Sequence, residues 1–179
     1  MTVTVSPQTF QYVHFDAELI QRVADGLVAA LGLDLPVVIE VDETTPLARI
    51  SVDIGETVTI RAESGAFEDT RRPRHQSEDA TAVSLGRVLL RARDRLVGGF
   101  GEAPADRELT LAQFAAWEAY SAGRLERLGL QVNQQRWRYN FRNRHGFRDL
   151  ADLAFDRLWT SDGLTWGELD EISRSASGS

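Results

Sequence analysis

The alternation of apolar and polar positions predicts one helix, then three short strands, then several helices. The first helix is expected from about Asp16 to Leu31, because apolar residues recur three and four positions apart: Leu19, Ile20, Val23, Leu27, Val28 and Leu31. Asp16 is a typical N-cap, and Gly32 is a typical residue just after a helix. Strict alternation predicts strands over 37–41, 50–54 and 58–62. Gly55-Glu56 indicates an antiparallel hairpin that turns near Ile54–Thr57.

The segment ESGAFEDTRRPRHQ, residues 63–76, interrupts this pattern and predicts a loop of about a dozen residues. A loop of this length is either a functional segment or a plain crossover, and the sequence leaves both open. Ser77 then caps a helix that ends at Gly98-Gly99, with a buried stripe at Leu85, Val88, Leu89, Ala92 and Leu96.

Capping boxes predict where two later helices begin. Thr110-x-x-Gln113 opens a helix that ends at Gly129, and Thr165-x-x-Glu168 opens a short last helix. Another amphipathic helix is expected from Phe147 to Trp159, with its apolar face at Phe147, Leu150, Leu153, Ala154 and Leu158. The order of elements predicts an α+β fold in a single domain over 1–179. A helix and small antiparallel or mixed sheet occupy 1–70, a helical part occupies 77–170, and 171–179 form a flexible tail.

The amino-acid composition excludes several kinds of catalytic and metal-binding chemistry. The 179 residues include no cysteine, and all 20 basic residues are arginine. Without cysteine there is no disulfide, thiolate nucleophile or cysteine zinc site, and without lysine there is no Schiff base or P-loop lysine. The absence of lysine is typical of a GC-rich genome and indicates a bacterial source. The N-terminus has no signal-peptide pattern, and no apolar run has the length of a membrane span, so a soluble, cytoplasmic protein is expected.

The net charge of −7 is unevenly distributed. Residues 71–95 hold 7 arginines and 3 acids, and residues 131–149 hold 5 arginines and 1 acid, so each segment carries +4. An acidic chain repels phosphate as a whole, which argues against bulk duplex DNA, but a local anion site stays open.

The stretch RWRYNFRNRHGF, residues 136–147, holds four arginines, four aromatic residues and a histidine. Polar residues ahead of it and Gly146 behind it favour a helix. Aromatic faces stack bases and guanidinium groups bind phosphate, so an anion site is one interpretation, and arginines paired with the chain's own carboxylates are the other. The candidate ligand-binding residues are Arg138, Arg142, Arg144 and His145, joined by Arg87, Arg91 and Arg95 at four-residue spacing.

Catalytic motifs are missing from the sequence. The three histidines, His14, His75 and His145, are isolated, and HQSED places only His75 near two acids, Glu78 and Asp79. There is no H-E-x-x-H, no G-x-S-x-G and no P-loop. We therefore assign no catalytic residue, no metal ligand and no cofactor.

The layout of residues 15–125 resembles that of the smallest zincin metallopeptidases: helix, strand, hairpin, loop, long helix, and a second helix that contains WEAYSAGRLERLG. In that family the helix after the hairpin carries H-E-x-x-H. The corresponding helix here, SEDATAVSLGRVLLRARDRL, has no histidine, and only Glu118 stands where the third zinc ligand would be. The resemblance implies a zincin-like scaffold that cannot hold catalytic zinc.

Three functions follow from these patterns. The first is a non-enzymatic binding or assembly module whose arginine-aromatic surface takes an anionic small molecule or an acidic protein partner. The second is a hydrolase-type enzyme of unrecognised class that uses clustered acids with His75. The third is a structural protein that forms homo-oligomers.

Overall fold

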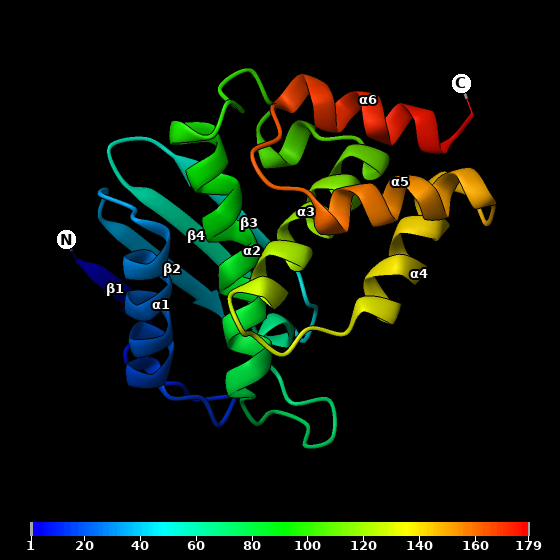
Figure 1. The fold of residues 1–179 in the computed structure, drawn as a ribbon. Helices are drawn as coiled ribbons and strands as arrows, with labels where there is room; N and C mark the ends of the chain where they lie inside the picture. Colours follow the sequence, from blue (N-terminus) through cyan, green and yellow to red (C-terminus); the bar gives the residue numbers. More distant parts are fainter. Residues whose placement is uncertain (1, 179) are drawn as a thin grey trace. The chain divides into compact units, whose positions relative to one another are not determined.

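A computed structural model describes residues 2–178, and the chain divides after Ala92 into two compact units (Figure 1). The first unit contains all four strands, the helix α1 (Ala17–Leu31) and most of α2 (Glu78–Val97). The second contains the end of α2 and four further helices. The α+β class is confirmed. The expected single domain stays a prediction, since compactness does not show whether either unit folds alone.

The sheet of the first unit has the order β1-β2-β4-β3. Its strands are β1 (Val3–Ser6), β2 (Val37–Asp42), β3 (Ile50–Ile54) and β4 (Val58–Glu63). β1 and β2 pair in parallel, β2 and β4 pair in parallel, and β3 and β4 form the predicted antiparallel hairpin. β1, β2 and β4 therefore end at the same edge of the sheet. Among the strands of residues 2–178, β1 was not predicted, because it alternates only over Val3 and Val5.

Alternating burial gives this sheet one apolar face. Val37 and Ile39 of β2 lie in register with Val58 and Ile60 of β4, and all four are buried. α1 packs beside β1 (Figure 1). The predicted limits of α1 are confirmed: the Asp16 carboxylate accepts from the Glu18 N–H at 2.9 Å, and Gly32 adopts φ 65°.

The second unit is a bundle of four helices: α3 (Leu111–Arg127), α4 (Gln134–His145), α5 (Asp149–Thr160) and α6 (Trp166–Ala176). α3 contacts each of the other three, and the core between them contains Trp117, Tyr120, Phe141, Phe155 and Leu158. A Cβ added at Gly123 of α3 would lie 2.8 Å from the Trp159 carbonyl carbon, so glycine permits the close approach of α3 to α5.

Local capping predictions are confirmed throughout this bundle. Both capping boxes form, at Thr110 with Gln113 and at Thr165 with Glu168. α4 ends at Gly146, as predicted, and Asn133 caps its start by accepting from the Arg136 N–H at 3.2 Å.

Several predicted apolar positions and one boundary are wrong. In α5 the predicted face is largely exposed, with Phe147 at 63%, Leu150 at 51% and Leu153 at 67% of full exposure. Ala154 and Leu158 are buried as predicted, and the rest of the buried face is formed by Ala151, Phe155 and Trp159. Leu96, predicted in the buried stripe of α2, is also exposed. The expected tail begins too early, because α6 extends to Ala176 and buries Ile172 and Ala176; residue 179 lies outside the described residues.

Across residues 2–178, no helix combines the length and the apolar character needed to cross a bilayer.

Candidate functional site

Two of the predicted binding arginines on α4 are paired with carboxylates of α5. Arg142 donates from Nε and Nη2 to the two oxygens of Asp152, at 2.8 and 2.9 Å. This hydrogen bonding raises the pKa of Arg142 and lowers that of Asp152. Arg138 donates to Asp156 at 2.6 Å and lies 4.5 Å from the centre of the Phe155 ring. Both guanidinium groups therefore already have their anions.

His145 is buried in the second unit. Its Nδ1 donates to the Phe141 carbonyl at 3.0 Å, which leaves Nε2 to accept from the Ser173 hydroxyl at 2.8 Å. Its ring stacks on Phe141 with 3.9 Å between the ring centres. Burial lowers the pKa of His145, so the neutral ring is the favoured form. Arg144 is exposed, and within the described chain its side chain has no ion-pair partner.

The predicted binding arginines of α2 also interact with other groups of the protein or are buried in it. Arg95 donates to Asp106 at 2.8 Å and to the Pro104 carbonyl at 2.8 Å, and it lies over the Trp117 ring at 4.6 Å. Arg91 is fully buried, and Arg87 is partly buried. Of the seven predicted residues, only Arg144 is both exposed and without an ion-pair partner in the described residues.

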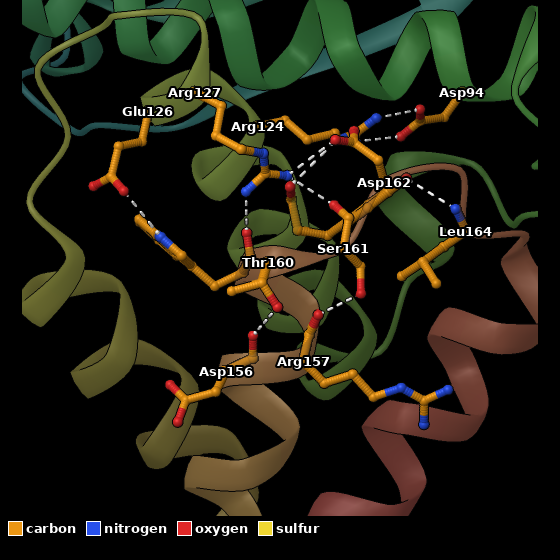
Figure 2. Close-up of polar contacts among 12 residues, drawn as sticks. Asp94, Arg124, Glu126, Arg127, Asp156, Arg157, Thr160, Ser161, Asp162 and Leu164 are labelled. Atoms are coloured by element: carbon orange, nitrogen blue, oxygen red, sulfur yellow. Dashed lines mark hydrogen bonds and ion pairs between the residues drawn. The ribbon is translucent and has the colours of Figure 1, made fainter.

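A further arginine cluster in the second unit was not predicted (Figure 2). Arg124 donates to both oxygens of buried Asp94, at 2.8 and 2.7 Å, and Trp117 Nε1 donates to the same carboxylate at 2.8 Å. Arg127 donates to the Trp159 and Ser161 carbonyls at 2.6 and 2.8 Å, where α5 ends. A cation at a helix C-terminus is favourable, so Arg127 joins α3 to the end of α5, whereas Arg124 joins α3 to the last turns of α2.

The first unit contains a cavity of about 430 Å³ at the edge of the sheet where β1, β2 and β4 end. Its walls come from the segments that follow these three strands and from the loop before α2: Tyr12, Val13, Glu43, Thr44, Pro46, Ser64, Glu68 and Arg74. In α/β sheets, ligands bind outside the carboxyl ends of parallel strands, because several connecting segments converge there.

Backbone N–H groups hold both carboxylates of this cavity. Glu43 Oε1 accepts from the N–H groups of Gln11 and Tyr12, at 2.7 and 2.5 Å. Glu68 Oε1 accepts from the Arg74 N–H at 2.5 Å, and Arg74 adopts φ 65°, which is unusual for a residue other than glycine. Among residues 2–178, no ion pair engages Glu43, Glu68 or the Arg74 guanidinium. The residues that line the cavity thus include two acids and one arginine.

The predicted loop over 63–76 forms one side of this cavity. It folds back on itself, because the Asp69 N–H donates to the His75 carbonyl at 2.8 Å and the Ser77 N–H donates to the Phe67 carbonyl at 2.9 Å. The His14 N–H donates to the Arg74 carbonyl at 2.8 Å, and the rings of His14 and His75 stack with their centres 4.7 Å apart. The loop is thereby attached to the segment after β1.

The predicted cluster of His75, Glu78 and Asp79 does not line the cavity. Glu78 and Asp79 are exposed in the first turn of α2. Within residues 2–178, no three His, Asp or Glu side chains gather as a metal would require. Glu118 is buried in α3.

Sequence reasoning missed the cavity because its two charged walls are distant along the chain. Glu68 and Arg74 lie in the loop after β4, whereas Glu43 follows β2, so Glu43 meets them through the parallel pairing of β2 with β4. In the sequence, the alternation of Val3 and Val5 could have indicated β1. The loop predicted over 63–76 could have indicated one side of the cavity.

Comparison with known proteins finds no matching family model, no similar curated protein and no similar solved structure. The zincin-like resemblance therefore stays a prediction.

Proposed function

We propose that this protein is a binding module that takes a small polar molecule in the cavity at the carboxyl ends of β1, β2 and β4. The supporting observation is that one cavity of about 430 Å³ contains Glu43, Glu68 and Arg74, none of them in an ion pair within the described chain. Ligand pockets usually span about 300–1,000 Å³ and contain a few polar groups that orient the ligand.

This proposal moves the site away from the arginine-aromatic helix that the sequence favoured. An anionic ligand on α4 would have to displace Asp152 from Arg142 and Asp156 from Arg138. In the cavity, a ligand would meet charged groups that have no such competitor among the described residues.

Thermal shift and calorimetry with a chemical panel test this function. The panel contains basic, neutral and acidic amino acids, diamines, dicarboxylates, nucleotides and sugar phosphates. At least one class should stabilise the wild type, and Thr44→Trp, which places a large ring at the cavity wall, should abolish that effect. Thr70→Trp is the control, because Thr70 is exposed in the loop over 63–76, which forms one side of the cavity, but does not itself line the cavity. Absence of any stabilising class would reject the function.

A second candidate function is self-assembly through the surface between α4 and α5. Tyr139 and Phe147 are exposed, and their rings meet edge to face with centres 6.0 Å apart. Leu150, three positions after Phe147, is also exposed. Arg144 and Asp149 are exposed on this hairpin, and neither forms an ion pair within the described chain. In a two-fold dimer, Arg144 of each copy would meet Asp149 of the other, so we propose a second copy as the occupant of this surface.

Light scattering tests the assembly. Arg144→Glu and Asp149→Arg should each weaken the dimer, and the double variant should restore it, because the two charges are exchanged. Arg136→Glu, an exposed change at the start of α4, should have no effect. A wild type that is monomeric up to about millimolar concentration would rule out this assembly, since that affinity corresponds to only about 4 kcal/mol.

A further inference from the structure

The cavity has a charge pattern that specifies its ligand more closely, and this inference rests on the proposed function. Glu43 and Glu68 each use only Oε1 for backbone hydrogen bonds, so each Oε2 can accept from a ligand. Hydrogen bonds from neutral N–H groups position a carboxylate but do not cancel its charge. Both acids line the same cavity, and each keeps one carboxylate oxygen that accepts no hydrogen bond within the described residues.

Arg74 supplies the opposite charge in the same cavity. Its backbone is fixed by Glu68 and by the His14 N–H, and Arg74 is one of the residues that line the wall. A guanidinium offers a planar fork of N–H donors that fits a carboxylate with two parallel hydrogen bonds. Together, the three groups give the cavity a formal charge of −1.

We propose that the cavity binds a free basic α-amino acid. The α-carboxylate pairs with Arg74, and the α-ammonium and the side-chain cation pair with the two glutamates. Such a ligand has two cations and one anion, which complements the cavity group by group and in net charge. Tyr12, Val13 and Pro46 supply apolar wall for the methylene chain.

The same pattern disfavours other classes of ligand. A dicarboxylate places two negative charges, and a phosphate about −1.5 to −2, against Glu43 and Glu68, with Arg74 as the one cation of the lining to neutralise them. A diamine satisfies both glutamates but leaves Arg74 without an anion. A neutral amino acid leaves one glutamate without a cation.

Calorimetry at pH 7 and low salt tests the inference with L-lysine and L-arginine against two truncated probes. Cadaverine lacks the carboxylate of lysine, and 6-aminohexanoate lacks its α-ammonium. At least one of the two amino acids should bind, and each probe should bind more weakly by about 10-fold or more, since one charge-assisted interaction is lost. Succinate should not bind.

Three substitutions test which cavity side chain binds which charged group of the amino acid. Glu43→Gln and Glu68→Gln keep an Oε1 acceptor for the backbone, so both should fold, and each should weaken binding of the amino acid by about 10-fold. Arg74→Gln should remove the preference for lysine over cadaverine. Arg71→Gln, in the same loop but outside the cavity wall, is the matched control and should change nothing.

The outcomes separate the two proposals. If neither basic amino acid binds but another class binds and Thr44→Trp blocks it, the ligand class is wrong and the binding function holds. If no class binds, both are overturned. Binding of lysine or arginine that none of the three cavity variants weakens would overturn the assignment to this site.

Discussion

The ion pair between Arg124 and Asp94 shows how a buried arginine of the second unit holds the fold. Both side chains are nearly fully buried, and the pair is bidentate. Removing one partner of a buried pair leaves an uncompensated charge, which typically costs about 3–5 kcal/mol. We expect Arg124→Met to lower the free energy of unfolding by this amount, measured by urea denaturation.

The matched control is Arg174→Met, because Arg174 pairs with Asp170 at 2.8 Å on the surface of α6. Exposed pairs contribute about 0–1 kcal/mol. Equal losses in the two variants would contradict the structural role of Arg124.

His145 gives the second unit a pH dependence. Burial lowers its pKa in the folded protein from the ordinary value of 6.5, so the unfolded chain binds the proton more readily. The stability from the neutral ring is complete above pH 6.5 and is lost as the pH falls through the lowered folded pKa. We expect the free energy of unfolding to decrease from pH 7 to pH 5, and His145→Gln to make that decrease shallower.

The contribution of Asp152 to stability changes in a different pH range from that of His145, so the two effects can be measured separately. Its hydrogen bonds with Arg142 lower its pKa from 3.8, so its contribution is lost only in more acidic solution. An unchanged slope between pH 7 and pH 5 in His145→Gln would show that the buried histidine does not titrate with unfolding.

At the scale of a helix, two substitutions in α5 test which of its faces is buried. Phe155 is fully buried in the aromatic core and meets Phe141 and Trp159, whereas Leu153 is exposed two positions earlier. We expect Phe155→Ala to cost about 3–5 kcal/mol. Leu153→Ala should change stability by no more than about 0.5 kcal/mol, as exposed substitutions usually do. The same denaturation measurement compares them, and a larger loss from Leu153→Ala would restore the face predicted from sequence.

The limits of sequence prediction follow from how local each feature is. The caps at Asp16, Thr110 and Thr165 were predictable because each one involves residues within one helical turn. The face of α5 was not, because Leu150 and Leu153 fit an apolar period as well as Phe155 does, and only packing against α3, α4 and α6 selects among them. The cavity was still less predictable, because it depends on strand order.

At the scale of the whole chain, the formal charge is distributed unequally between the units. Residues 1–92 contain 8 arginines and 14 acidic residues, a net of −6, whereas residues 93–179 contain 12 and 13, a net of −1. The cavity lies in the more acidic unit. A field of this sign attracts cations and opposes anions before any contact is made.

This field makes the affinity for a basic amino acid depend on salt. Added salt shortens the screening length from about 30 Å at 0.01 M to about 3 Å at 1 M, so it removes the attraction of distant acids but leaves the contacts with Glu43, Glu68 and Arg74. We expect the dissociation constant measured by calorimetry to rise several-fold over this range. A neutral amino acid, which has no net charge for the field to act on, should respond less. If salt changes neither ligand's affinity while Glu43→Gln still weakens binding, only the cavity's own groups attract the ligand and the acidic surface around them has no part in binding.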